Sequence, residues 1–157
     1  MPIKGGNMNN GQNEQQFNQQ LQVMQILNGA LLASVGLLGV VGTISPNGAP
    51  ENFPFDSKLF IVFAGIMAVL SFVLPMVILK NTVKTKKDLG LQDLFTSFIL
   101  SLALSECVGI FGLIAKIHAG DVTVFWILLA ASAGLVAIRF PTRDRVLGML
   151  AALRAGH

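Results

Sequence analysis

Four long apolar stretches, at residues 21–44, 59–79, 94–117 and 122–138, constrain this chain more than any other feature. About 20 apolar residues suffice for a helix to cross the hydrocarbon core of a bilayer, and helices of about 17 still do so. The composition agrees, because 53% of the 157 residues are hydrophobic and only 12% are charged, whereas about a quarter of the residues in a soluble domain are charged. We therefore expect an all-α membrane protein with four transmembrane helices.

Polar segments divide the chain around these four spans. Residues 1–16 are rich in Asn, Gln and Gly, and such a composition predicts a disordered arm. Residues 17–140 form the predicted transmembrane domain, in which the connections between spans favour two antiparallel hairpins. Residues 141–157 repeat apolar residues at helical spacing between arginines, which predicts a short amphipathic helix lying on the membrane surface.

Basic residues are distributed unevenly between the two ends of the spans. With four spans, one side of the membrane holds nine lysines and arginines, Arg139 among them, and the other side holds only Lys58 and Lys116. Because basic residues stay on the cytoplasmic side, we expect both termini in the cytoplasm and the protein in a bacterial inner membrane. We also expect lipid headgroups to contact Lys80, Lys84, Lys86, Lys87, Arg143, Arg145 and Arg154.

Small residues recur along the spans at spacings of three and four. In lipid, such residues let the backbones of two helices approach closely. The spacing fits a partner helix in the same chain or in a second copy. The residues expected to pack in this way are Gly29, Ala33, Gly36, Gly39, Gly42, Gly109, Gly112 and Gly134.

Glu106 is the single acidic residue of the third apolar stretch and lies near its middle. A carboxylate at the centre of a bilayer costs on the order of 3 kcal/mol to insert, so its presence needs a reason. A rise of about 1.5 Å per residue, counted from the outer ends of the spans, puts Ser34, Ser71 and Ser132 near the depth of Glu106. Because buried carboxyl groups take hydrogen-bond partners, we expect Glu106 to carry a proton and to point among these hydroxyls and that of Ser105.

The segment LALSECVGIFGLIAKI, residues 102–117, resembles the acid-bearing helix of subunit c, the proteolipid of rotary ATP synthases. The likeness lies in a small-residue run before the acid and an aromatic-Gly-Leu step after it. It implies that Glu106 carries a proton or a cation. The matching positions are Leu102, Ala103, Glu106, Ile110, Phe111, Gly112 and Leu113.

The layout of the whole chain is similar to that of small four-span bacterial membrane proteins that are uncharacterised. This second likeness includes the sequence Pro-Thr-Arg at residues 141–143, directly after the last span. It covers most of the chain and implies the four-span fold without implying a function.

Other chemistry has little support in the sequence. His118 and His157 have no cysteine or carboxylate partners at the spacing of metal ligands, so we expect no metal, no cofactor and no enzyme. The lysines of residues 80–87 have no aromatic residues between them, which argues against nucleic acid as a partner. Three functions remain: a structural or interaction protein that forms a homo-oligomer or accompanies a larger membrane complex, a proton or cation carrier that uses Glu106, and a small transporter or lipid-binding protein.

Overall fold

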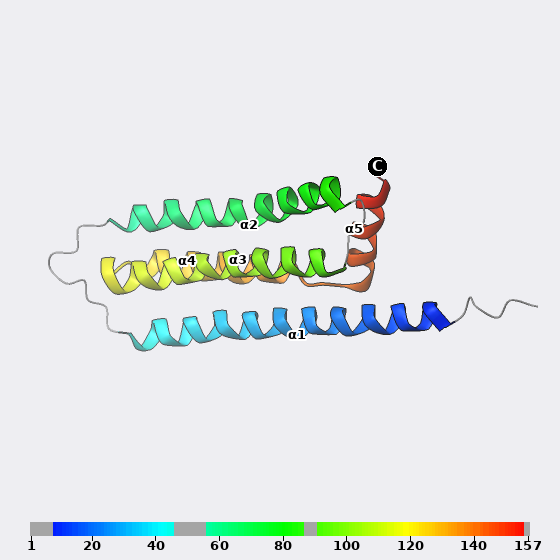
Figure 1. The fold of residues 1–157 in the computed structure, drawn as a ribbon. Coiled ribbons are helices and arrows are strands. Elements are labelled where there is room, and N and C mark those ends of the chain that lie inside the picture. The colour runs from blue at the N-terminus through cyan, green and yellow to red at the C-terminus, as the bar shows by residue number, and fades with distance from the viewer. Residues whose placement is uncertain (1–7, 46–55, 87–90, 156–157) are drawn as a thin grey trace, which may run out of the picture.

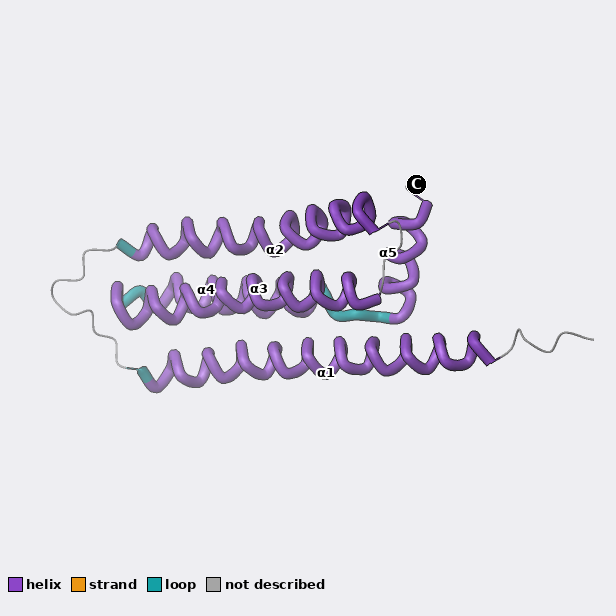
Figure 2. Tube along the Cα trace, viewed as in Figure 1, coloured by secondary structure: helices purple, strands orange, loops and turns teal. Residues whose placement is uncertain are grey.

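The computed structural model describes residues 8–45, 56–86 and 91–155, and these residues form five helices and no strand. Four of the helices lie side by side along a common axis, and the fifth lies across one end of the bundle (Figure 1). The helices are α1 (Met8–Ile44), α2 (Ser57–Lys86), α3 (Leu91–Ala119), α4 (Val122–Ile138) and α5 (Arg143–Ala155). Almost all described residues are helical, and only short loops and turns separate the helices (Figure 2). The all-helical class expected from the sequence is confirmed.

Three helices, α1, α2 and α3, are long and apolar enough to cross a bilayer. The 17 residues of α4 meet the same test only together with α5, from which a bend of 76° separates them. Many large apolar side chains of α2 point outward, and Val69 and Met76 are 62% and 63% exposed. Soluble monomers rarely expose apolar surface on this scale. These helices are compatible with a membrane protein that has three spans, or four if α4 and α5 form one.

Two helices extend further than the sequence predicted. α1 begins at Met8, so the helix takes in residues 8–16 of the predicted arm, since adding residues to an existing helix costs far less than starting a new one. α2 likewise continues through Lys80 to Lys86. Residues 1–7 of the arm and residues 87–90 of the connection between the second and third spans lie outside the described residues.

α3 is the central helix of the bundle. α2 and α4 both pack against it, whereas α1 packs against α3 and α4. α3 and α4 form a tight antiparallel hairpin, since Gly120 ends α3 with a φ of 68° and Asp121 accepts a hydrogen bond from the backbone nitrogen of Val124 at 3.0 Å, as an N-cap residue does. α1 and α2 run in opposite directions (Figure 1), but each packs mainly against other helices. The first of the two expected hairpins is therefore not confirmed as a packed pair.

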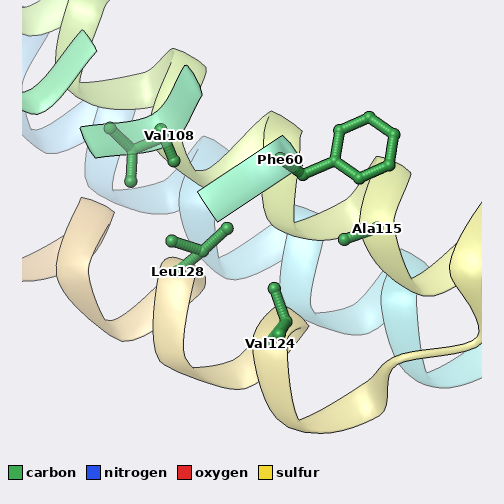
Figure 3. Close-up of a cluster of buried hydrophobic side chains, with 6 residues drawn as sticks. Phe60, Val108, Ala115, Val124 and Leu128 are labelled. Carbon is green, nitrogen blue, oxygen red and sulfur yellow. The ribbon is translucent and has the colours of Figure 1, made fainter. Parts of the chain in front are cut away.

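The buried apolar side chains form two clusters. The larger joins three helices through Phe60 and Ala64 of α2, Val108 and Ala115 of α3, and Val124 and Leu128 of α4 (Figure 3). The smaller joins α1 to α4 through Val35, Phe125 and Leu129. Helices in lipid associate through such close van der Waals packing rather than through removal of apolar surface from water.

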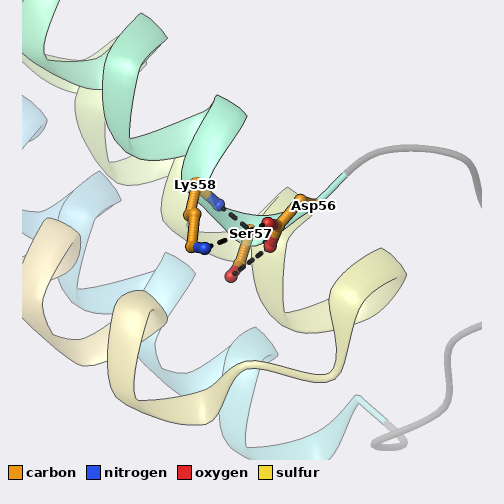
Figure 4. A network of polar contacts seen from close by, with 3 residues as sticks. All are labelled: Asp56, Ser57 and Lys58. Carbon is orange, nitrogen blue, oxygen red and sulfur yellow. Dashed lines mark hydrogen bonds and ion pairs between the residues drawn. The ribbon is translucent and has the colours of Figure 1, made fainter.

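A group of exposed polar contacts marks the start of α2. The Asp56 carboxylate accepts hydrogen bonds from the backbone nitrogen of Lys58 at 3.4 Å and from Ser57 Oγ at 3.3 Å (Figure 4). Lys58 Nζ lies 3.7 Å from the other carboxylate oxygen. Exposed ion pairs contribute about 1 kcal/mol or less, so this group fixes where α2 begins and adds little to stability.

Candidate functional site

Arg139 lies at the centre of a polar cluster inside the bundle. It caps the end of α4, and its guanidinium turns back between α2 and α3. Nη1 donates hydrogen bonds to the carbonyl oxygen of Ser101 at 2.8 Å and to Ser105 Oγ at 2.7 Å, and Nη2 donates to Ser71 Oγ at 3.0 Å. The guanidinium carbon also lies 4.2 Å from the ring centroid of Phe72, within cation–π range. One side chain therefore joins three helices.

The serines of this cluster use both their donor and their acceptor capacity. Ser71 Oγ donates to the carbonyl of Ala68 at 2.6 Å, and Ser105 Oγ donates to the carbonyl of Ser101 at 2.9 Å. Each hydroxyl proton is thus directed away from Arg139, and a lone pair of each oxygen faces the guanidinium. The arginine has partners on both neighbouring helices, and all of those partners among the described residues are neutral.

Pro75 leaves a backbone carbonyl of α2 without its helical partner, and a serine of α3 satisfies it. Proline has no N–H, so the carbonyl of Ser71, four residues earlier, loses its partner within α2. Ser101 Oγ donates to that carbonyl at 3.1 Å, and Ser97 Oγ donates to the carbonyl of Pro75 at 3.1 Å. The Ser101 hydroxyl of the neighbouring helix therefore satisfies the carbonyl that the proline leaves unpaired, as a proline in a membrane helix requires, and Ser97 adds a second bond between the same two helices.

Glu106 lies on another face of α3, the face that packs against α1. Ser34 Oγ of α1 donates a hydrogen bond to Glu106 Oε1, so two residues that the sequence placed at one depth are in contact. The carboxyl group is partly buried. The three other serines named with it lie elsewhere, since Ser71 and Ser105 bind Arg139 and Ser132 Oγ donates to the carbonyl of Ser105 at 2.8 Å. Counting residues gives depth but not direction, and neighbouring helical positions point about 100° apart.

Polar residues of α1 attach this helix to the end of α4. Asn28 is fully buried, and its Nδ2 donates to the carbonyl of Val136 at 3.2 Å. Gln25 Nε2 donates to the carbonyl of Pro141 at 3.2 Å. Carbonyl groups in the last turn of a helix lack their full set of intrahelical donors, and Asn28 supplies one to Val136 of α4, whereas Pro141 lies in the connection between α4 and α5. The contacts hold α1 beside the Arg139 cluster.

Lys116 lies buried at the opposite end of the bundle. Its side chain is only 5% exposed, its Nζ donates to the carbonyls of Gly42 and Ser45, and it lies 5.7 Å from the ring centroid of Phe125. The end of α1 carries a partial negative charge, which a cation stabilises. The charge distribution predicts that this lysine lies on the outer side of the membrane, and the structure adds that it holds the end of α1 against α3 and α4.

The small residues fall into two groups. A Cβ atom on Gly112 would lie 3.0 Å from Leu128 Cβ, and one on Gly109 would lie 3.2 Å from Ser132 Oγ, so both glycines permit close contact between α3 and α4. Gly39 and Gly42 similarly face Leu129 and Phe125 across the contact between α1 and α4. Gly29, Gly36 and Gly134 face open space, and Ala33 is exposed.

The basic residues expected at lipid headgroups are only partly described. Lys80, Arg143 and Arg145 are exposed, and Arg145 Nη1 donates to the carbonyl of Ile138. Lys87 and the side chains of Lys84, Lys86 and Arg154 lie outside the described residues.

Sequence reasoning missed Arg139, Ser97 and Ser101 as members of an internal cluster. A signal was present, because Ser97, Ser101 and Ser105 recur every fourth residue and so line one face of α3. Within the described part of the chain, no three His, Cys, Asp or Glu side chains lie close enough to hold a metal ion. Comparison with known protein families, curated proteins and solved structures finds no match for this chain.

Proposed function

We propose that this chain is a four-span protein of a bacterial inner membrane with a structural or interaction role, either as a homo-oligomer or as an accessory subunit of a larger membrane complex. Both termini lie in the cytoplasm, in keeping with nine basic residues on that side and two on the other. The 17 residues of α4 rise about 25 Å, close to the roughly 30 Å thickness of the hydrocarbon core. Residues 139–142 continue to the surface on which α5 lies.

The observation that carries this proposal is the hydrogen bond between Ser34 and Glu106. A carboxyl group that carries ions has to exchange them, whereas one that binds a neighbouring helix contributes to packing. Glu106 joins α3 to α1, and Arg139 joins α4 to α2 and α3. Both residues are costly to place in a membrane, and in both cases the contacts of the side chain hold helices together.

A groove between α1 and α4 supports the interaction part of the proposal. It has a volume of about 530 Å³ and is lined by small residues of both helices, including Gly36, Gly39, Ala130 and Ala133, with Trp126 at one side. Small residues on an outer face allow a further helix to approach closely. A second copy of the chain or a partner subunit would bring such a helix.

The mass of the purified particle tests this proposal. After extraction in mild detergent, light scattering is expected to give a protein mass that is a multiple of 16.7 kDa, or a larger complex. Gly36→Leu is expected to reduce that mass, and Gly65→Leu, at an open position on α2, is the matched control. A protein mass of one chain at every concentration, together with no partner cross-linked to it in native membranes, would contradict the proposal.

The second candidate function is a proton or cation carrier that uses Glu106. One observation favours it, because the carboxyl group is only partly buried and its described partner is a hydroxyl rather than a fixed cation. The resemblance of residues 102–117 to the subunit c helix argues in the same direction. Carbodiimides react with protonated carboxyl groups in membranes, so labelling of Glu106 and loss of ion flux in Glu106→Gln proteoliposomes would establish the carrier. The structural role predicts no flux that depends on Glu106.

A further inference from the structure

A pocket of about 320 Å³ lies where α5 crosses the end of the bundle. All five helices contribute to its walls or rim. Most of the lining is apolar and includes Phe72, Met76 and Leu79 of α2 and Met149 of α5. The volume falls at the lower end of the range of small-molecule sites, so the pocket has room for part of an amphiphile and not for a whole diacyl lipid.

Two arginines line this apolar pocket. Arg139, which is half-buried, and Arg145 of α5, which is exposed, are both among its lining residues. None of the described residues that line the pocket is acidic. The pocket therefore combines two positively charged side chains with a lining that is mostly apolar.

Arg139 retains donors that its protein partners do not use. Its three hydrogen bonds to described residues occupy three of the five N–H groups of a guanidinium. Its described partners are hydroxyl groups, a carbonyl and an aromatic ring, all of them neutral. A charge in an apolar setting is costly without a counterion, and the two N–H groups that no described residue accepts match the oxygens of a phosphate or carboxylate.

The position of the pocket relative to the bilayer favours a lipid headgroup as the bound anion. Phe72 and Met76, on its α2 wall, are exposed on the outside of the bundle, where the acyl chains of a bilayer would lie. Arg145 and α5 lie at the end of the bundle that faces the cytoplasm in the proposed topology. Basic pockets at the cytoplasmic ends of transmembrane helices are suited to anionic headgroups.

We infer that this pocket binds one anionic phospholipid of the cytoplasmic leaflet. The phosphate lies between Arg139 and Arg145, and part of one acyl chain packs against Phe72, Met76 and Leu79. The site shares the membrane placement of the proposed function but does not depend on the oligomeric state, so the mass measurement above and the binding measurement below fail independently.

Lipid binding to the full-length protein tests this inference. Protein stripped of lipid in neutral detergent is titrated with phosphatidylglycerol or phosphatidylcholine in mixed micelles, and native mass spectrometry counts the bound lipids. One phosphatidylglycerol is expected to bind about tenfold or more tightly than phosphatidylcholine, and Arg139→Gln is expected to weaken it by about tenfold, as for loss of a charge-assisted hydrogen bond. Equal affinity for the two lipids would overturn the inference.

Two further variants keep the test decisive even if Arg139→Gln does not fold. Met149→Trp is designed to fill the pocket from α5 without replacing a partner of Arg139, and it is expected to weaken phosphatidylglycerol binding while helix content stays unchanged. Lys58→Gln is the matched control, because it removes one positive charge at the start of α2, where Lys58 is exposed and does not line the pocket. Equal binding by Met149→Trp and the unmodified protein would refute the site. Full competition by inorganic phosphate would also refute it, because the pocket would then hold a soluble anion.

Discussion

Replacement of Arg139 by lysine is expected to lower the free energy of unfolding by about 1–2 kcal/mol. Lysine keeps the positive charge, but its single nitrogen cannot reach both Ser71 and the Ser101–Ser105 pair, which bind different guanidinium nitrogens. Hydrogen bonds between membrane helices contribute about 0.6 kcal/mol each, so the loss of one or two of them costs about 0.6–1.2 kcal/mol. An ammonium group is also more strongly hydrated than a guanidinium, which adds to the cost of burying it.

Lysine is a cleaner substitution than methionine at this position. Methionine would remove the three hydrogen bonds, worth about 2 kcal/mol together. It would also remove a charge that costs about 2.5–3.5 kcal/mol at the centre of a membrane and less near its edge. These two effects have opposite signs and similar size, so Arg139→Met does not isolate the hydrogen bonds.

Unfolding by titration with sodium dodecyl sulfate in neutral detergent measures this difference. Circular dichroism follows helix content, and the fluorescence of Trp126, the only tryptophan in the sequence, follows α4. Trp126 is a suitable reporter because its ring, which is itself exposed, lies 4.9 Å from that of Phe125, centroid to centroid, and Phe125 is buried in the contact with α1.

The exposed Arg143 provides the control for this experiment. Arg143→Lys is expected to change the free energy of unfolding by less than about 0.5 kcal/mol, as most surface substitutions do. If Arg139→Lys were no more destabilising than Arg143→Lys, the assignment of Arg139 as the link between α2, α3 and α4 would be wrong.

Two further predictions use the same titration. Gly112→Val is expected to destabilise the protein by about 1–3 kcal/mol, because a Cβ atom at this position would lie 3.1 Å from the Phe125 carbonyl oxygen. Gly134→Val is the control and is expected to be neutral, since Gly134 faces open space. Equal effects of the two substitutions would argue against the close contact of α3 and α4. Ser101→Ala is expected to cost about 1–2 kcal/mol by leaving a buried carbonyl unpaired, but almost nothing in a Pro75→Ala background, where α2 regains the missing N–H. An equal cost in both backgrounds would contradict the role assigned to Ser101.

The sequence predicted the position of residues along the helix axes better than the neighbouring helix that each side chain faces. The bounds of α4 coincide with the predicted span at residues 122–138, because Asp121 and Gly120 mark its start and apolar content marks its length. The match in depth between Ser34 and Glu106 also follows from counting residues. Which serine faces which helix depends on how each helix is rotated, and a pattern that is apolar on all sides does not determine that rotation.

Arg139 illustrates a second limit of sequence reasoning. An arginine directly after a span is normally counted with the cytoplasmic surface, yet a long side chain at a helix end reaches several ångströms in either direction. Here Ser101 donates to the carbonyl that Pro75 leaves unpaired, and Ser101 and Ser105 on the same face of α3 offer acceptors to Arg139 inside the bundle. The inward direction depends on contacts between segments about 30–70 residues apart, which no local pattern contains.

The central claim is that Glu106 holds α3 to α1 through Ser34. A double-mutant cycle measures this directly, with Ser34→Ala, Glu106→Ala and the double variant unfolded in the same titration. The claim predicts a coupling free energy of about 0.6–1.7 kcal/mol between the two side chains, the range of interhelical hydrogen bonds in membranes. Additive effects, with no coupling, would contradict it.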